Sequence, residues 1–104
     1  MTSKINVIRF LVFTLLMLSL GAAMAADPVK GRAIYGGQCA GCHGVNGLPQ
    51  VAEIPNFTMG QGLMKSDREL METIKKGKGI MPAFQGVLSD EEILDVLAHI
   101  RTFF

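Results

Sequence analysis

Hydrophobic and polar positions follow a helical period most clearly near the end of this chain. Apolar side chains recur there every three or four residues, at Ile93, Val96, Leu97, Ile100 and Phe104. The run just before them, Ser89-Asp90-Glu91-Glu92, is a capping box, in which the first and last side chains bond to each other's backbone. The pattern predicts an amphipathic helix that begins at Ser89 and contains these apolar positions.

Two earlier segments also have helix signals. Ser66-Asp67-Arg68-Glu69 is a second capping box, and Gly77 ends the segment that follows it. Asp27-Pro28 suits the start of another helix, because aspartate caps free N–H groups and proline fits the first helical position. We expect that helix to end at the paired glycines Gly36-Gly37.

The rest of the chain lacks a regular period. Residues 44–65 contain Pro49, Pro55 and four glycines, which indicates an irregular loop. No stretch alternates between apolar and polar residues as a strand would. The sequence therefore predicts an all-α fold of three or more helices joined by long loops.

Residues 1–25 have the organisation of a secretory signal peptide. Lys4 and Arg9 precede an apolar run, and Ala23-Met24-Ala25 fits the small-residue cleavage pattern. The apolar run, residues 10–20, is short for a membrane-spanning helix, which needs about 20 apolar residues. We expect cleavage after Ala25 and export to the periplasm. An uncleaved membrane anchor is the alternative.

Cleavage would leave one small domain, residues 26–104. Removing the first 25 of the 104 residues leaves 79, and domains of this size bury enough apolar surface only with help. A disulfide between Cys39 and Cys42 would close almost no loop and would constrain the unfolded chain very little. A large apolar cofactor is the better candidate for the missing stabilisation.

The charge balance excludes one class of partner. Without Lys4 and Arg9, the domain has eight basic residues against nine acidic ones. Nucleic-acid-binding domains concentrate positive charge, so we expect no nucleic acid as a partner.

Cys39-Ala40-Gly41-Cys42-His43 is the C-x-x-C-H pattern of covalent haem attachment. The two thiols can add across the two vinyl groups of a haem, and a turn of helix keeps them at the separation that those groups need. The histidine that follows is then placed to ligate the iron. The motif predicts one covalently bound haem c.

Two other readings of the motif fit the chain less well. A thioredoxin-like C-x-x-C pair would need a βαβ setting, which this sequence does not show. A structural zinc site needs four ligands, and Cys39, Cys42 and His43 supply three. The other histidine, His99, lies inside the predicted C-terminal helix.

The domain resembles the class I c-type cytochromes over nearly its whole length. Gly31 and Tyr35 match the small and aromatic residues by which that family's first helix crosses its last, and residues 97–101 resemble its terminal helix. His99 departs from the family, which usually has an aromatic residue there. The resemblance implies a cytochrome c-like fold wrapped around one haem. It also implies that the carbonyl of Pro55 accepts a hydrogen bond from Nδ1 of His43.

Four methionines of the domain are candidates for the second axial ligand: Met59, Met64, Met71 and Met81. The segment Gly79-Ile80-Met81-Pro82-Ala83-Phe84 resembles the family's distal loop, and its glycine and proline can turn a sulfur atom inward. Met71 falls on the apolar face of a predicted helix, where methionine usually fills the core. We therefore expect Met81 to be the ligand, with Met59 as the next candidate and His99 in a structural role.

The resemblance implies a one-electron carrier rather than an enzyme. We expect a monomer that meets its redox partners briefly at the exposed haem edge, with Lys75, Lys76 and Lys78 attracting an acidic partner. One alternative is a haem subunit dedicated to a periplasmic dehydrogenase or oxidase. Another is a sensor or peroxidase with an open iron position, which the intact distal segment disfavours.

Overall fold

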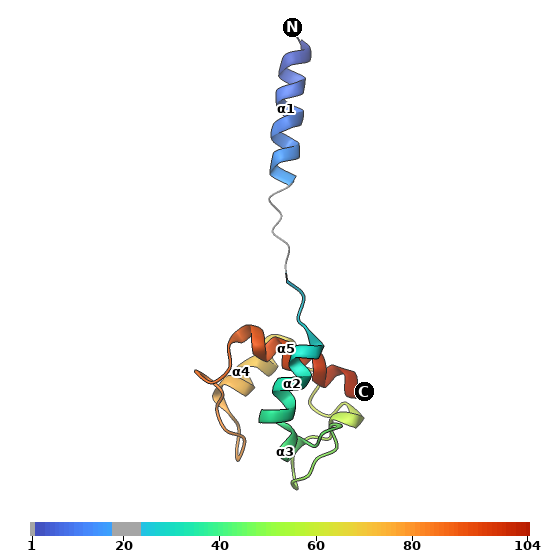
Figure 1. The fold of residues 1–104 in the computed structure, drawn as a ribbon, viewed down its shortest axis with the longest axis vertical. Coiled ribbons are helices and arrows are strands. Elements are labelled where there is room, and N and C mark those ends of the chain that lie inside the picture. The colour runs from blue at the N-terminus through green and yellow to red at the C-terminus, as the bar shows by residue number, and fades with distance from the viewer. Residues whose placement is uncertain (1, 18–23) are drawn as a thin grey trace.

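The structure, a computed structural model, describes residues 2–17 and 24–104, in which helices are joined by irregular loops (Figure 1). Its elements in chain order are α1 (Thr2–Met17), α2 (Pro28–Gln38), α3 (Ala40–His43), the 3₁₀ helix η1 (Phe57–Met59), α4 (Asp67–Lys76), α5 (Asp90–Ile100) and the 3₁₀ helix η2 (Arg101–Phe103). The only β pairings among the described residues are two isolated bridges, Lys78 with Met81 and Gln85 with Leu88. The predicted all-α class is confirmed.

Helix α1 holds most of the predicted signal peptide. It stands apart from the other helices in Figure 1, and its apolar side chains are exposed. None of the described helices is both long and apolar enough to span a bilayer. The predicted cleavage segment reaches into residues 18–23, which lie outside the described residues, so cleavage after Ala25 stays a prediction.

Helix α2 begins as predicted but ends later. The side chain of Asp27 accepts hydrogen bonds from the N–H groups of Val29 and Lys30, and Pro28 is the first helical residue. The predicted end at Gly36-Gly37 is wrong, because the helix runs through both glycines to Gln38. A glycine ends a helix by adopting a left-handed conformation, and neither of these has a positive φ.

Helices α4 and α5 both begin with the predicted capping boxes. In α4 the N–H of Glu69 donates to Ser66 Oγ at 3.2 Å, and the N–H of Ser66 donates to Glu69 Oε2 at 2.9 Å. Ser89 and Glu92 repeat this arrangement in α5. Helix α5 ends at Ile100, so Phe104 is not part of its apolar face, and its side chain is 64% exposed.

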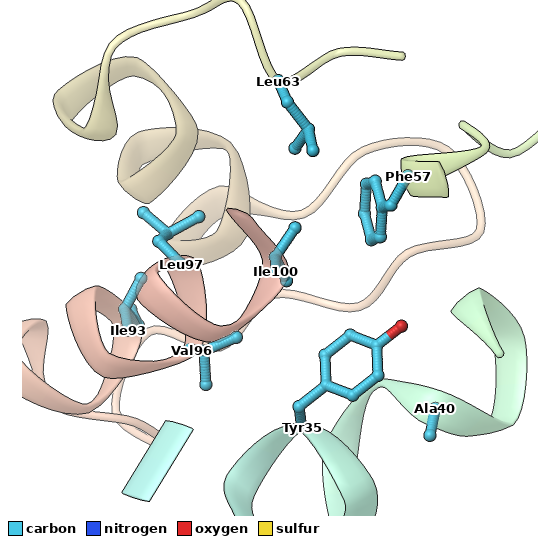
Figure 2. Close-up of a cluster of buried hydrophobic side chains, with 8 residues drawn as sticks. All are labelled: Tyr35, Ala40, Phe57, Leu63, Ile93, Val96, Leu97 and Ile100. Atoms are coloured by element: carbon cyan, nitrogen blue, oxygen red, sulfur yellow. The ribbon is translucent and has the colours of Figure 1, made fainter. Parts of the chain in front are cut away.

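The core forms where α2 crosses α5. Gly31 permits this crossing, because a Cβ atom there would overlap the backbone carbonyl of Asp95. Buried side chains converge on the crossing from α2, α3, η1, α5 and the loop before α4 (Figure 2). They are Tyr35, Ala40, Phe57, Leu63, Ile93, Val96, Leu97 and Ile100. The crossed helices provide a fixed frame beside α3.

Candidate functional site

Helix α3 brings the C-x-x-C-H residues together on one turn. The backbone changes direction at Cys39, where φ is −124° and ψ is −34°, and the N–H of His43 then donates to the Cys39 carbonyl at 2.9 Å. Gly44 ends the turn with a φ of 81°. Cys39, Cys42 and His43 therefore share one turn of backbone, which fixes their spacing along the chain.

The two thiols are not joined to each other. Cys39 is half-buried, Cys42 is exposed, and burial raises the pKa of the Cys39 thiol to about 11. A redox-active C-x-x-C pair needs a thiol with a lowered pKa, so this environment does not suit thioredoxin-like chemistry. The described residues also contain no group of three or more histidine, cysteine or acidic side chains placed to hold a metal ion, which disfavours the zinc reading.

The imidazole of His43 lies flat against the ring of Phe57. The ring centroids are 4.7 Å apart and the planes differ by 12°. Burial lowers the pKa of His43, which favours the neutral form that binds metals. Phe57, which comes two residues after Pro55, was not expected to contact the site, and the sequence gives no signal for a contact between these two separate segments.

The Nδ1 atom of His43 is buried and has no hydrogen-bond partner in the described part of the chain. The expected bond to the Pro55 carbonyl is therefore not formed in this structure, and the role of Pro55 stays a prediction. Buried polar atoms are nearly always partnered, so this nitrogen needs an explanation. Two unbonded thiols and a neutral, incompletely satisfied imidazole on one turn fit a covalently attached haem.

Met81 lies in a tight turn after α4. Its N–H donates to the Lys78 carbonyl at 3.0 Å, and its carbonyl accepts from the Lys78 N–H at 3.1 Å. Gly77 is required beside it, because φ there is 75° and a Cβ atom would crowd the Met81 carbonyl. Phe84 is buried and donates its N–H to the Ile74 carbonyl at 3.0 Å. The turn is thus attached to α4 on both sides.

The four methionines differ in their surroundings. Met59 is 70% exposed and Met64 is 88% exposed, whereas Met71 packs against the core cluster. Met81 is half-buried and lies outside the helices. No hydrogen bond or ring contact joins Met81 to the C-x-x-C-H turn within the described residues, so the structure brings Cys39, Cys42 and His43 together and leaves Met81 on a separate loop.

Tyr35 connects the helix crossing to this turn. Its hydroxyl donates to the Gly44 carbonyl at 2.6 Å, and its ring is 5.2 Å from His99 and 5.3 Å from Phe103. His99 also meets Phe103 edge-to-face at 4.9 Å. Burial and then the charge of Arg32 lower the pKa of His99. These contacts agree with a structural role for His99 as part of an aromatic cluster.

Comparison with known proteins identifies sequences that are similar to this chain. The sequence profile of the family described as cytochrome c oxidase, cbb3-type, subunit III, matches residues 26–100. Cytochrome c6 of Thermosynechococcus vestitus is 37% identical over 81 residues, which cover 76% of this chain and 72% of that protein. Cytochrome c6 of Synechocystis is 34% identical over 87 residues, covering 81% and 72%. Cytochrome c6 of Chlorolobion braunii is 37% identical over 82 residues, covering 72% and 89%.

Proposed function

Because the chain belongs to the cytochrome c family, whose small members bind one covalent haem c and carry single electrons, we propose that it is a periplasmic carrier between redox proteins. We further propose that Cys39 and Cys42 attach the haem, and that His43 and Met81 are its axial ligands. The bound haem supplies an iron atom that alternates between the ferrous and ferric states. No substrate is transformed, so the protein acts as a carrier and not as an enzyme.

The α3 turn is the observation that carries this proposal. Each thiol would form a thioether by adding its sulfur and its proton across a vinyl group, which leaves the two cysteines unable to oxidise to a disulfide. Burial keeps His43 neutral and able to donate a nitrogen lone pair, and Phe57 fixes the plane of the ring. Orientation of a ligating ring by its neighbours tunes the electron density at a metal.

Met81 is proposed as the second ligand because its position combines partial burial with a defined backbone. The turn from Lys78 to Met81 is closed by two hydrogen bonds, so the sulfur can be presented from a fixed point. A thioether favours ferrous iron and raises the reduction potential, which suits a carrier. Met59 also has a hydrogen-bonded backbone, since it ends η1, but it and Met64 are mostly exposed.

A second function is favoured by one finding. The matching family profile is described as an oxidase subunit, so a haem subunit dedicated to one oxidase is the alternative. The relatives of similar size are cytochromes c6. Gentle purification of the native protein separates the two functions: a carrier is recovered alone at the mass of one chain, and a subunit is recovered with a larger partner.

We predict that Met81→Ala removes the near-infrared sulfur-to-iron charge-transfer band of the oxidised protein. The variant should also bind cyanide or carbon monoxide at the freed iron position, and its reduction potential should fall. Its helices should remain, because Cys39, Cys42 and His43 still hold the haem. Absorption spectra, ligand titration and circular dichroism measure these three effects.

Met59→Ala is the matched control, because it removes the same thioether from an exposed position on η1. It should retain the band, exclude carbon monoxide and leave the potential unchanged. If Met59→Ala lost the band and Met81→Ala kept it, Met59 would be the axial ligand and Met81 would not. Rapid binding of carbon monoxide by the wild-type protein would instead support an open-iron sensor.

A further inference from the structure

Asp95 is a buried carboxylate without a cationic partner among the described residues. It lies on α5 at the crossing with α2, and only 5% of it is exposed. Its Oδ1 atom accepts a hydrogen bond of 2.7 Å from the backbone N–H of Asp27. The ion pairs of the described residues use other acids: Lys75 pairs with Asp90, Lys76 with Glu72, and Arg101 with Asp67.

A buried, unpaired carboxylate is unfavourable, because it has lost its hydration and gained no opposite charge. Ala26, the residue before the hydrogen-bond donor Asp27, places its own backbone nitrogen near the carboxylate. Consecutive residues of a chain are about 3.8 Å apart, so this nitrogen is about 6.5 Å or less from the Asp95 carboxylate oxygen. Ala26 is exposed and can turn toward Asp95 without disturbing the core.

We infer that Asp95 is the binding site for the α-ammonium group of Ala26, which signal-peptide cleavage creates. A signal peptidase would hydrolyse the Ala25–Ala26 bond with one water molecule, leaving a carboxylate on Ala25 and an ammonium group on Ala26. Before cleavage, the Ala26 nitrogen is an uncharged amide. Processing therefore supplies the missing cation and strengthens the docking of α2 on α5. The inference rests on the proposed cleavage site, but not on the axial ligands.

The other charged groups near this position do not replace Asp95. The carboxylate of Asp27 is already engaged as the helix cap, accepting from Val29 N–H at 2.9 Å and Lys30 N–H at 3.3 Å. Glu91 and His99 lie one helical turn before and after Asp95 on α5; Glu91 is exposed, and burial lowers the pKa of His99 and so favours its neutral form. On α2, neither Lys30 nor Arg32 forms an ion pair with Asp95.

The test moves the ammonium group while leaving the domain unchanged. A Gly-Ser insertion between Ala25 and Ala26 displaces the mature N-terminus by two residues, and it is made in the wild-type, Asp95→Asn and Glu91→Gln backgrounds. All are exported haem-loaded proteins, and mass spectrometry identifies their first residue. We expect the insertion to lower Tm by about 4–8 °C in the wild-type and Glu91→Gln proteins, and to change it little in Asp95→Asn.

A titration of wild-type Ala26 by NMR keeps the inference testable if Asp95→Asn does not fold. An opposite charge nearby favours the ammonium form, so the pKa of this amine should lie above that of an ordinary α-amine. Because the folded-state pKa is raised, the added stability is present at lower pH and is lost as the pH rises through that pKa. An ordinary titration, or equal effects of the insertion with and without Asp95, would overturn the inference. A mature protein that does not begin at Ala26 would also overturn the inference, because cleavage after Ala25 is its premise. The proposal for the haem site would be unaffected.

Discussion

At the scale of single residues, the three glycines of α2 look alike in the sequence but have different roles. Gly31 is buried and faces the backbone of α5, where a Cβ atom would overlap the Asp95 carbonyl. A Cβ atom at Gly36 or Gly37 would meet nothing within 4 Å, and both residues have helical backbone conformations. The crossing angle and distance of the two helices therefore depend on Gly31 alone among these three.

We predict opposite effects for the same substitution at two of these positions. Gly31→Ala should lower the free energy of unfolding by about 3 kcal/mol, because the two backbones must move apart and the core opens. Gly36→Ala should raise it by about 0.5–1 kcal/mol, because alanine restricts the unfolded chain and fits the helix without strain. Guanidinium denaturation of the haem-loaded proteins measures both. Equal effects would show that the helices tolerate separation at Gly31.

At the scale of secondary-structure elements, the starts of helices were predictable and some ends were not. The capping boxes at Ser66 and Ser89 are local, since each needs only its own side chains and backbone, and both are present as predicted. The end of α2 was predicted wrongly, because Gly36 and Gly37 keep helical conformations where the prediction required a left-handed one. The local sequence pattern therefore predicts the first residue of a helix better than its last residue.

The same distinction applies to the site. The C-x-x-C-H motif predicted which residues share a turn, because the whole arrangement is contained in five consecutive residues. The stacking of His43 on Phe57 joins segments that are separated by a loop, and no periodicity in the sequence encodes it. Nor could spacing alone predict that Met59 would be exposed and Met81 half-buried, although the glycine and proline around Met81 indicated a turn.

One contact between elements was not anticipated from the sequence. Arg101, in η2, donates to Asp67 Oδ1 from Nε at 3.0 Å and from Nη2 at 2.7 Å. It also donates to the backbone carbonyls of Leu63 at 2.8 Å and Lys65 at 3.1 Å. Because Leu63 is buried in the same cluster as Phe57, this arginine holds the loop that supports the His43 ring.

We predict that Arg101→Gln loosens this loop while leaving the helices in place. The free energy of unfolding should fall by about 1–2 kcal/mol, since charge-assisted hydrogen bonds to two backbone carbonyls are lost. Hydrogen exchange of the Leu63 amide should accelerate more than that of amides in α5. Arg68→Gln, an exposed substitution one residue after Asp67, is the control and should change neither quantity. Uniform acceleration across the domain would mean that Arg101 contributes only to global stability.

At the scale of the whole molecule, a carrier must find its partners quickly and leave them quickly. Weak complexes with small interfaces meet both needs, and charged groups near the site guide the encounter. The three lysines near Met81 are not equivalent for this purpose. Lys75 has a side chain only 20% exposed and pairs with Asp90 at 2.9 Å, whereas Lys76 is 76% exposed and pairs with Glu72 at 3.5 Å. Lys78 is exposed and has no ion pair in the described part of the chain.

We predict that replacing Lys75, Lys76 and Lys78 together by glutamine slows electron transfer with an acidic redox partner by about tenfold at low salt. Most of this loss should come from Lys78 and Lys76, because Lys75 already neutralises Asp90 and contributes little field outside the protein. Stopped-flow rates measured at rising ionic strength should converge for mutant and wild type, since screening acts over about 10 Å at 0.1 M salt. The reduction potential of the triple variant should stay nearly that of the wild type, because the lysine charges act on the encounter with the partner and not on the iron.

Lys30→Gln removes one positive charge from α2, the same change that Lys78→Gln makes beside Met81, so it is the control for that single variant and should have little effect. Equal rates for the triple variant and the wild type at low salt would show that these lysines are only a solvated helix end. A loss of rate in Lys30→Gln equal to that in Lys78→Gln would show that the partner responds to net charge instead of to this surface.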